Sequence, residues 1–299
     1  MEGPLEWARW KENGVTTEAT AIGVRPVPRI DHIMVLLDEK AYRDVAETDF
    51  LGERFGRLTR KQADSSVAGA YATLGIAGEN TLVELFGGTI PGGTLTGGLV
   101  FSFEAQGSAT AARQVLDAAA GVEYHHDLVR RAVAGSVEPQ PWYHLISVNM
   151  GEASPLVLFL NEVTPEYLRS LGARPAEDGS LRRRDYLDAA LGGPAGPPRL
   201  MRDISGVTLA LSPARARRLA GALCPFGFEM SERDGEQRLR GPDLTIVTRV
   251  DDTAPQGVLE IQIDLVEGRH EPAEHRFGET SRLVIDPSGV AVWSFAPIS

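Results

Sequence analysis

The amino-acid sequence predicts an α+β fold built from repeated βαβββ units, and three features of the chain lead to this prediction. Segments with strand-like alternation, helical spacing and strand-like alternation again follow one another in the same order more than once. The segments that open the units resemble one another, as HIMVLLD, LVFSFEA and GVTLALS. The segments that close them also resemble one another, as LVELFGG, LVLFLNE and LEIQIDL. An internal repeat of this kind outweighs the assignment of any single element.

Composition excludes several classes of protein. The chain has 299 residues, of which 42% are hydrophobic and 24% are charged, as in a soluble globular protein with a substantial core. A formal net charge of -11 argues against nucleic-acid binding, which needs Lys and Arg to displace counterions from phosphates. No apolar run approaches the roughly 20 residues of a membrane-spanning helix, so we expect no membrane association. The single cysteine, Cys224, rules out an intramolecular disulfide and favours a cytoplasmic location.

Residues 1–28 are predicted to form an N-terminal extension. Its start, MEGPLEWARWKENG, contains acidic residues and lacks the apolar stretch of a signal peptide. Pro26 and Pro28 mark its end. We expect the extension to pack on the body of the protein or on a partner subunit rather than to cover a substrate.

Residues 29–88 are predicted to form the first unit, which carries the strongest candidate site residues. In the opening segment RIDHIMVLLD, His32 alternates with the aliphatic residues that fill the opposite face. In the closing segment TLVELFGG, Glu84 alternates with its neighbours in the same way. The two side chains can therefore share one face of a curved sheet, and this pair indicates a site.

The rest of the chain is predicted to hold two further units and a linker. The second unit covers residues 97–163 and forms, with the first, a pair over residues 29–163. Residues 164–200 are expected to be a helical linker that starts at Thr164 and Pro165. Residues 201–299 are expected to hold the third unit, closed by GVLEIQIDLV, and a C-terminal hairpin. This hairpin is either a truncated fourth unit or an added strand pair.

The repeated signatures resemble the vicinal oxygen chelate superfamily, which includes glyoxalase I, extradiol dioxygenases and bleomycin-resistance proteins. The resemblance covers about residues 29–266 and is strongest to a bacterial branch with three modules. It implies that paired βαβββ modules form a cup of curved mixed sheets. It also implies helices on the convex side and a site in the concavity.

The resemblance further implies a position for a metal ion, because the superfamily takes its ligands from the first and last strands of its modules. His32 matches the first-strand position and Glu84 the last-strand position. If the first and third units pair, Glu260 completes a facial triad with open positions, and Gln262 on the same face can replace it. The metal would be a divalent ion, either Fe, Mn, Zn or Ni, or there is none.

The chain departs from the superfamily's pattern in its second and third units. In the predicted register, the second unit has Leu99 and Leu158 at the two ligand positions. The third unit has Gly206 at the first-strand position. The ligand set of a glyoxalase is therefore incomplete, and that of an extradiol dioxygenase is not visible.

Without a metal, Glu84 can serve as a general base whose pKa is raised by burial, with His32 as its hydrogen-bonding partner. His144, Trp142 and Tyr71 are predicted to contribute to substrate binding, because aromatic side chains can stack on a planar molecule. Gln262 is a further candidate for substrate binding.

Two hypotheses for function follow from the sequence. The first is an enzyme that acts on a small oxygenated, aromatic or secondary metabolite by lyase, isomerase or dioxygenase chemistry. The second is a non-catalytic protein that sequesters a small molecule, as bleomycin-resistance proteins do. Three units are an odd number for a fold that pairs them, so we expect either a degenerate fourth unit or a homodimer.

Overall fold

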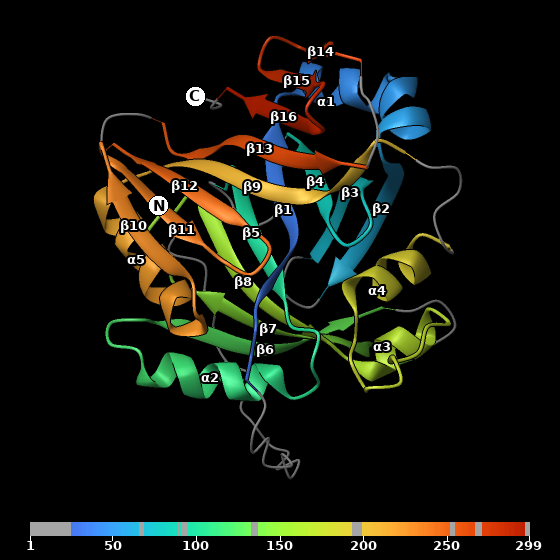
Figure 1. Cartoon of the computed structure of the whole chain (residues 1–299). Helices are drawn as coiled ribbons and strands as arrows, with labels where there is room; N and C mark the ends of the chain where they lie inside the picture. Colours follow the sequence, from blue (N-terminus) through green and yellow to red (C-terminus); the bar gives the residue numbers. More distant parts are fainter. Residues whose placement is uncertain are drawn as a thin grey trace, which may run out of the picture.

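The computed structural model describes residues 25–65, 69–88, 90, 95–132, 137–192, 199–251, 255–266 and 271–296. These residues form two eight-stranded sheets, of which one is closed into a barrel (Figure 1). The predicted α+β fold of repeated βαβββ units is confirmed. None of the described helices is both long and apolar enough to cross a membrane. The predicted N-terminal extension lies, up to residue 24, outside the described residues.

The first two units build the barrel. The first contains β1 to β4 with α1 and the π-helical turn η1, and the second contains β5 to β8 with α2. Their bounds are β1 Arg29–Leu37, α1 Glu39–Glu47, η1 Leu51–Phe55, β2 Arg57–Ser65, β3 Gly69–Ala77, β4 Leu82–Gly87, β5 Gly97–Ser102, α2 Ser108–Ala118, β6 Tyr124–Arg131, β7 Gln140–Val148 and β8 Leu156–Val163. In each unit the first and last strands are parallel neighbours, β1 with β4 and β5 with β8.

The two units join along two seams of unequal strength. At one seam β1 and β5 pair in antiparallel fashion over most of their lengths. At the other seam β2 and β6 are joined by a single residue pair, Ser65 with Arg131. The barrel order that results is β1-β4-β3-β2-β6-β7-β8-β5.

The helices start where side-chain acceptors meet the unpaired N–H groups of a first turn. The Asp38 carboxylate accepts the N–H of Ala41 at 2.8 Å and begins α1. Helix α2 instead starts at Gly107, whose left-handed φ of 81° suits a residue without Cβ. Its N–H groups are satisfied by Glu162 of β8, which accepts from Gly107 at 2.7 Å and from Ala109 at 2.6 Å. Glu162 therefore fixes α2 onto the outer side of its own sheet.

The second sheet contains the third unit and the C-terminal strands. Its elements are β9 Met201–Leu211, α5 Pro213–Leu223, the 3-10 turn η2 Cys224–Phe226, β10 Glu229–Arg233, β11 Glu236–Arg240, β12 Thr245–Val250, β13 Gly257–Leu265, β14 Ala273–Phe277, β15 Ser281–Asp286 and β16 Val290–Phe295. The strand order is β10-β11-β12-β9-β13-β16-β15-β14, and this sheet is open.

The third unit is closed by β12, and the prediction that GVLEIQIDLV closes it was wrong. β12 runs parallel to β9, as β4 runs parallel to β1. The segment GVLEIQIDL is β13, which pairs antiparallel with β9 as β5 pairs with β1. β13 therefore opens a fourth set of strands, β13 to β16, in which the described residues contain no helix. Alternation alone identifies a strand and not its partner, so the sequence could not distinguish the two assignments.

The linker between the barrel and the second sheet contains α3, Pro165–Ser170, and α4, Arg183–Ala190. The predicted helix start is present, since the Thr164 hydroxyl accepts the N–H of Tyr167 at 3.2 Å and Pro165 is the first helical residue. In Figure 1 both helices lie at one end of the barrel, beside β2 and the ends of β6 and β7.

One core holds the two sheets together. It contains Ile33 and Leu85 from the barrel together with Ile261 and Trp293 from the second sheet, and all four side chains are fully buried. Figure 1 shows β9 and β13 crossing over β1 and β5. The second sheet therefore covers one outer face of the barrel, and the inner face is left to a different set of side chains.

Candidate functional site

The two faces of β1 serve different environments. Ile33 and Val35 belong to the core between the sheets. Met34 instead packs with Phe86 and Val100 in a separate cluster on the inner side of the barrel. Because side chains alternate along a strand, His32 shares the inner side with Met34. Glu84 is the parallel partner of Met34 on β4, so it also faces inward.

Inside the barrel, five side chains form one continuous chain of polar contacts. His32 Nε2 lies 3.4 Å from Glu84 Oε2, and His32 Nδ1 lies 2.7 Å from Asp31 Oδ1. The Ser102 hydroxyl donates to Asp31 Oδ2 at 2.6 Å, and the Thr73 hydroxyl donates to Glu84 Oε1 at 2.8 Å. The side chains of His32 and Glu84 are 18% and 8% exposed, so little solvent screens the contact between them. The structure thus brings together the two residues that the sequence singled out.

Asp31 is a member of this chain that the sequence analysis missed. Strict alternation would place Asp31 on the face opposite His32. The pairing of β1 with β5 shifts register between Ile30 and His32, and this β-bulge lets Asp31 reach Ser102 on the inner side. A charged residue next to His32 in an otherwise apolar strand is the signal that could have indicated it.

The contacts of His32 place Nδ1 beside Asp31 and Nε2 beside Glu84. An ionised Asp31 can only accept, so Nδ1 of His32 carries a hydrogen. If Nε2 were a bare lone pair, it would face the lone pairs of Glu84 Oε2 and repel them. A proton bound to either Nε2 or Oε2 removes this repulsion. An imidazole and a carboxylate at this distance are residue types that can exchange a proton, as a general acid–base pair does.

Asp31 stays ionised in this position. Burial alone would raise the pKa of its carboxyl group, but the hydrogen bond and the charge of His32, the Ser102 hydroxyl and the charge of Arg183 together lower the pKa below its ordinary value. The ionised Asp31 fixes the orientation of the imidazole ring through its contact with Nδ1.

Acid is therefore expected to weaken the folded state through Asp31. A lowered pKa in the folded state contributes stability that is present above the ordinary value of 3.8 and is lost as the pH falls through the folded-state pKa. Urea unfolding of the wild type and of Asp31→Asn, measured from about pH 6 to about pH 3, tests this. The wild type should lose more stability over that range than the variant. Parallel curves would contradict the assignment.

Aromatic side chains of β7 and α4 lie near the carboxylates of Glu84 and Asp31. The pKa of Tyr143 on β7 is raised well above its ordinary value, first by burial and then by the negative charge of Glu84. The pKa of Tyr186 on α4 is also raised, by burial first, then by Tyr167 and by the charge of Asp31. The Trp142 ring contacts Tyr143, with centroids 4.9 Å apart. Trp142, a predicted substrate-binding residue, thus lies beside Tyr143, the tyrosine whose pKa is raised in part by Glu84.

Two predicted substrate-binding residues, His144 and Tyr71, are not found at this cluster in the described part of the structure. His144 alternates with Tyr143 on β7, pairs with Glu162 of β8 and stacks on His126, with ring centroids 5.7 Å apart. His144 therefore lies on the outer side, where Glu162 caps α2. The aromatic sequence of this strand end does not indicate which of the neighbouring residues faces inward. Tyr71 lies on β3, and its side chain is outside the described part of the structure.

Glu260 and Gln262 are not brought to this cluster. Both lie on β13, which pairs with β9 and β16 in the second sheet, whereas His32 and Glu84 lie in the barrel. The predicted triad of His32, Glu84 and Glu260 assumed that β13 closes the third unit. That assumption is wrong, so the triad is wrong with it.

The described donor set does not fit a resident metal ion. Such centres usually have at least three protein ligands, as in the three-ligand zinc sites and the two-histidine, one-carboxylate iron sites. Among the described residues, no three His, Cys, Asp or Glu side chains are arranged in this way. Only His32 Nε2 and Glu84 Oε2 face one another, because Asp31 is bound to the other ring nitrogen.

In the described strands of the second and third units, no carboxylate stands at the position equivalent to Glu84. In the first unit, Met34 of the first strand pairs with Glu84 of the last strand. The equivalent pairs are Val100 with Phe159 in the second unit and Thr208 with Val247 in the third. Phe159 and Val247 therefore replace Glu84. The predicted equivalents Leu99 and Leu158 are one residue out of register and lie in the core between the sheets.

Comparisons with known proteins show a family and a set of similar folds. A family model, described as a family of unknown function (DUF5829), matches residues 30–295. No curated protein matches the chain. Among solved structures, a hypothetical protein from Staphylococcus aureus has 13% identity and a TM-score of 0.49, over 84% of this chain and 95% of that one.

Two further similar structures have named activities. The Mn(II)-bound glyoxalase from Novosphingobium aromaticivorans has 13% identity and a TM-score of 0.43, over 89% of this chain and 81% of that one. Homoprotocatechuate 2,3-dioxygenase from Arthrobacter globiformis has 10% identity and a TM-score of 0.46, over 89% and 78%.

Proposed function

We propose that this chain, which belongs to the family of unknown function DUF5829, is an enzyme that moves a proton on a small oxygenated molecule bound inside the barrel. The observation that supports the proposal is the contact chain Asp31–His32–Glu84, in which an imidazole lies between two carboxylates. Isomerisation and elimination are the reactions that this arrangement suits. Both begin with removal of a proton from a carbon next to a carbonyl group.

Each polar residue has a separate role in the proposed reaction. Glu84 removes the proton from carbon and returns it to a neighbouring carbon or to a leaving group. Thr73 holds Oε1 of Glu84, so Oε2 is the atom that exchanges the proton. His32 carries the positive charge that stabilises the ionised Glu84 and, after proton transfer, the negative charge on the substrate oxygen. Asp31 holds the imidazole ring in place through Nδ1.

Solvent deuterium exchange tests this proposal even while the substrate is unidentified. A panel of small keto acids and hydroxyketones is incubated with the full chain in deuterated water, and the carbon-bound protons are followed by NMR. We expect at least one compound to exchange faster with the protein than in buffer. Compounds that bind yet exchange at the buffer rate throughout the panel would favour the alternative, a protein that sequesters a small molecule.

Removal of metal ions should leave the exchange unchanged. The reason is that the described donor set offers two facing ligands where a resident ion needs about three. Exchange rates are measured before and after dialysis against EDTA, together with the metal content of the protein. A loss of exchange that Mn, Fe, Zn or Ni restores would overturn this part of the proposal.

A further inference from the structure

Two cationic side chains meet at the ring of Trp142, which stands where the pairing of β6 with β7 shifts register. The Lys61 ammonium lies 4.9 Å from the centroid of the Trp142 ring, and the Arg131 guanidinium lies 5.2 Å from it. Lys61 comes from β2 and Arg131 from β6, the strands that meet at the weaker seam of the barrel. In a chain of net charge -11, a local concentration of positive charge of this kind points to a specific use.

Neutral groups hold Arg131 in place. Its Nη1 donates to the hydroxyl of Tyr167 at 2.7 Å, and its guanidinium lies 5.7 Å from the centroid of the Tyr167 ring. Within the described residues, no carboxylate forms an ion pair with Arg131. Stacking on aromatic rings orients the planar guanidinium while leaving its charge uncompensated.

Lys61 lies on the same face of the first sheet as Glu84. Lys61 is the antiparallel partner of Thr73, and such partners point to the same face of a sheet. Thr73 donates its hydroxyl hydrogen to Glu84, so Lys61 and Glu84 both face the barrel interior. From the other side, Tyr143 contacts Trp142 and faces the charge of Glu84.

We propose that Arg131 and Lys61 bind the carboxylate of a planar, aromatic or conjugated substrate, whose ring lies against Trp142 and Tyr143. A guanidinium fork matches the two oxygens of a carboxylate, and an ammonium adds a point charge from a second strand. The substrate's carboxylate would be held at this wall while its reacting carbon faces Glu84. The position of the reacting carbon in this inference rests on the proposed function of Glu84. The carboxylate site formed by Arg131 and Lys61 does not depend on that proposal.

Binding of matched probes tests the carboxylate site. Benzoate and phenylacetate are compared with their neutral amides, benzamide and phenylacetamide, by calorimetry on the full chain. The wild type should bind each carboxylate about tenfold more tightly than its amide, which corresponds to about 1.4 kcal/mol. Arg131→Gln and Lys61→Gln should each remove most of this preference and leave amide binding unchanged. Arg131→Lys should retain part of the preference for carboxylates. If Arg131→Gln does not fold, Arg131→Lys is the variant that tests the role of Arg131.

The controls separate this inference from the proposed function. Arg130→Gln removes the same charge at the exposed neighbouring position and should keep the carboxylate preference. Glu84→Gln should also keep it, because binding does not require proton transfer. If Glu84→Gln left deuterium exchange intact, the proposed function would fail while the carboxylate preference stood. Equal binding of acid and amide by the wild type, binding of neither, or a preference that survives Arg131→Gln would overturn the site.

Discussion

Glu84→Gln is expected to lower the rate of substrate deuterium exchange by about 10²-fold or more, because it removes the group that accepts the proton. The amide has nearly the shape of the carboxylate, and its oxygen can still accept the hydrogen bond from Thr73. Folding should therefore change little, and ligand affinity should persist. The measurement is the exchange rate by NMR, together with thermal unfolding of both proteins.

The matched control for this variant is Glu260→Gln. Glu260 is also a strand carboxylate, but it lies on β13 of the second sheet. The exchange rate of Glu260→Gln should equal that of the wild type. If Glu84→Gln retained the wild-type rate, Glu84 would not be the base. If Glu260→Gln lost exchange as well, the placement of Glu260 outside the site would be wrong.

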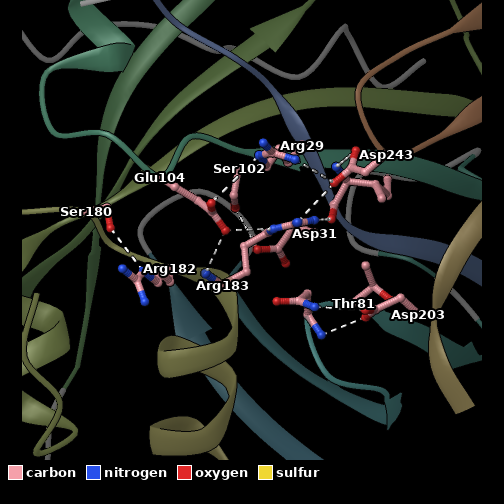
Figure 2. Close-up of polar contacts among 12 residues, drawn as sticks. Arg29, Asp31, Thr81, Ser102, Glu104, Ser180, Arg182, Arg183, Asp203 and Asp243 are labelled. Atoms are coloured by element: carbon pink, nitrogen blue, oxygen red, sulfur yellow. Dashed lines mark hydrogen bonds and ion pairs between the residues drawn. The ribbon is translucent and has the colours of Figure 1, made fainter. Parts of the chain in front are cut away.

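Arg183→Ala is expected to cost about 1.5–3 kcal/mol of unfolding free energy, because it removes a buried guanidinium that hydrogen-bonds to charged groups. The Arg183 side chain is 8% exposed. Its Nε donates to Glu104 Oε1 at 3.1 Å, and its Nη2 lies 3.0 Å from Asp243 Oδ2. Its Nη1 also donates to the carbonyl oxygen of Ile30. Figure 2 shows Arg183 between Glu104 and Asp243, close to Asp31 and Ser102.

These contacts make Arg183 a connection between the linker and the first three units. Arg183 starts α4 in the linker, Ile30 belongs to the first unit, Glu104 follows β5 of the second, and Asp243 precedes β12 of the third. Burial raises the pKa of Asp243 above its ordinary value, even though Arg183 lowers it in part, so removal of Arg183 should leave this carboxylate still more costly to ionise.

Urea unfolding measures the effect of Arg183→Ala, with Arg184→Ala as the control. Arg184 is the next residue of α4, its side chain is 61% exposed, and it lies 3.7 Å from the Glu79 carboxylate. Loss of an exposed pair of this kind should cost less than about 1 kcal/mol. Equal unfolding curves for the two variants would contradict the role of Arg183.

The order of the strands in the first two units, and the inward faces of His32 and Glu84, could be predicted from the sequence. Each of these strands is apolar on both faces or on one, so a single polar residue stands out against its neighbours. The partners of these two residues could not be predicted in the same way. Asp31 faces inward only because of a β-bulge, and a bulge depends on how two strands pair across the sheet.

Errors in the later units have one cause, which is register. A shift of one residue exchanges the two faces of a strand, and this put Leu99 and Leu158 where Val100 and Phe159 belong. A shift of one whole strand put β13 in the place of β12 and made Glu260 a candidate ligand. Strand alternation carries no information about which strand is the neighbour. Both errors therefore concern the pairing and register of strands that are distant in the sequence.

The strand set β13 to β16 makes the second sheet differ from the barrel. The segment 266–272 is too short for the crossover of about a dozen residues that brings a later strand back parallel to the first. As a result β16 runs antiparallel to β13, and the second sheet does not repeat the closure of the barrel. In the described residues only the first of the two sheets closes on itself. A binding titration should saturate at a stoichiometry of one small molecule per chain.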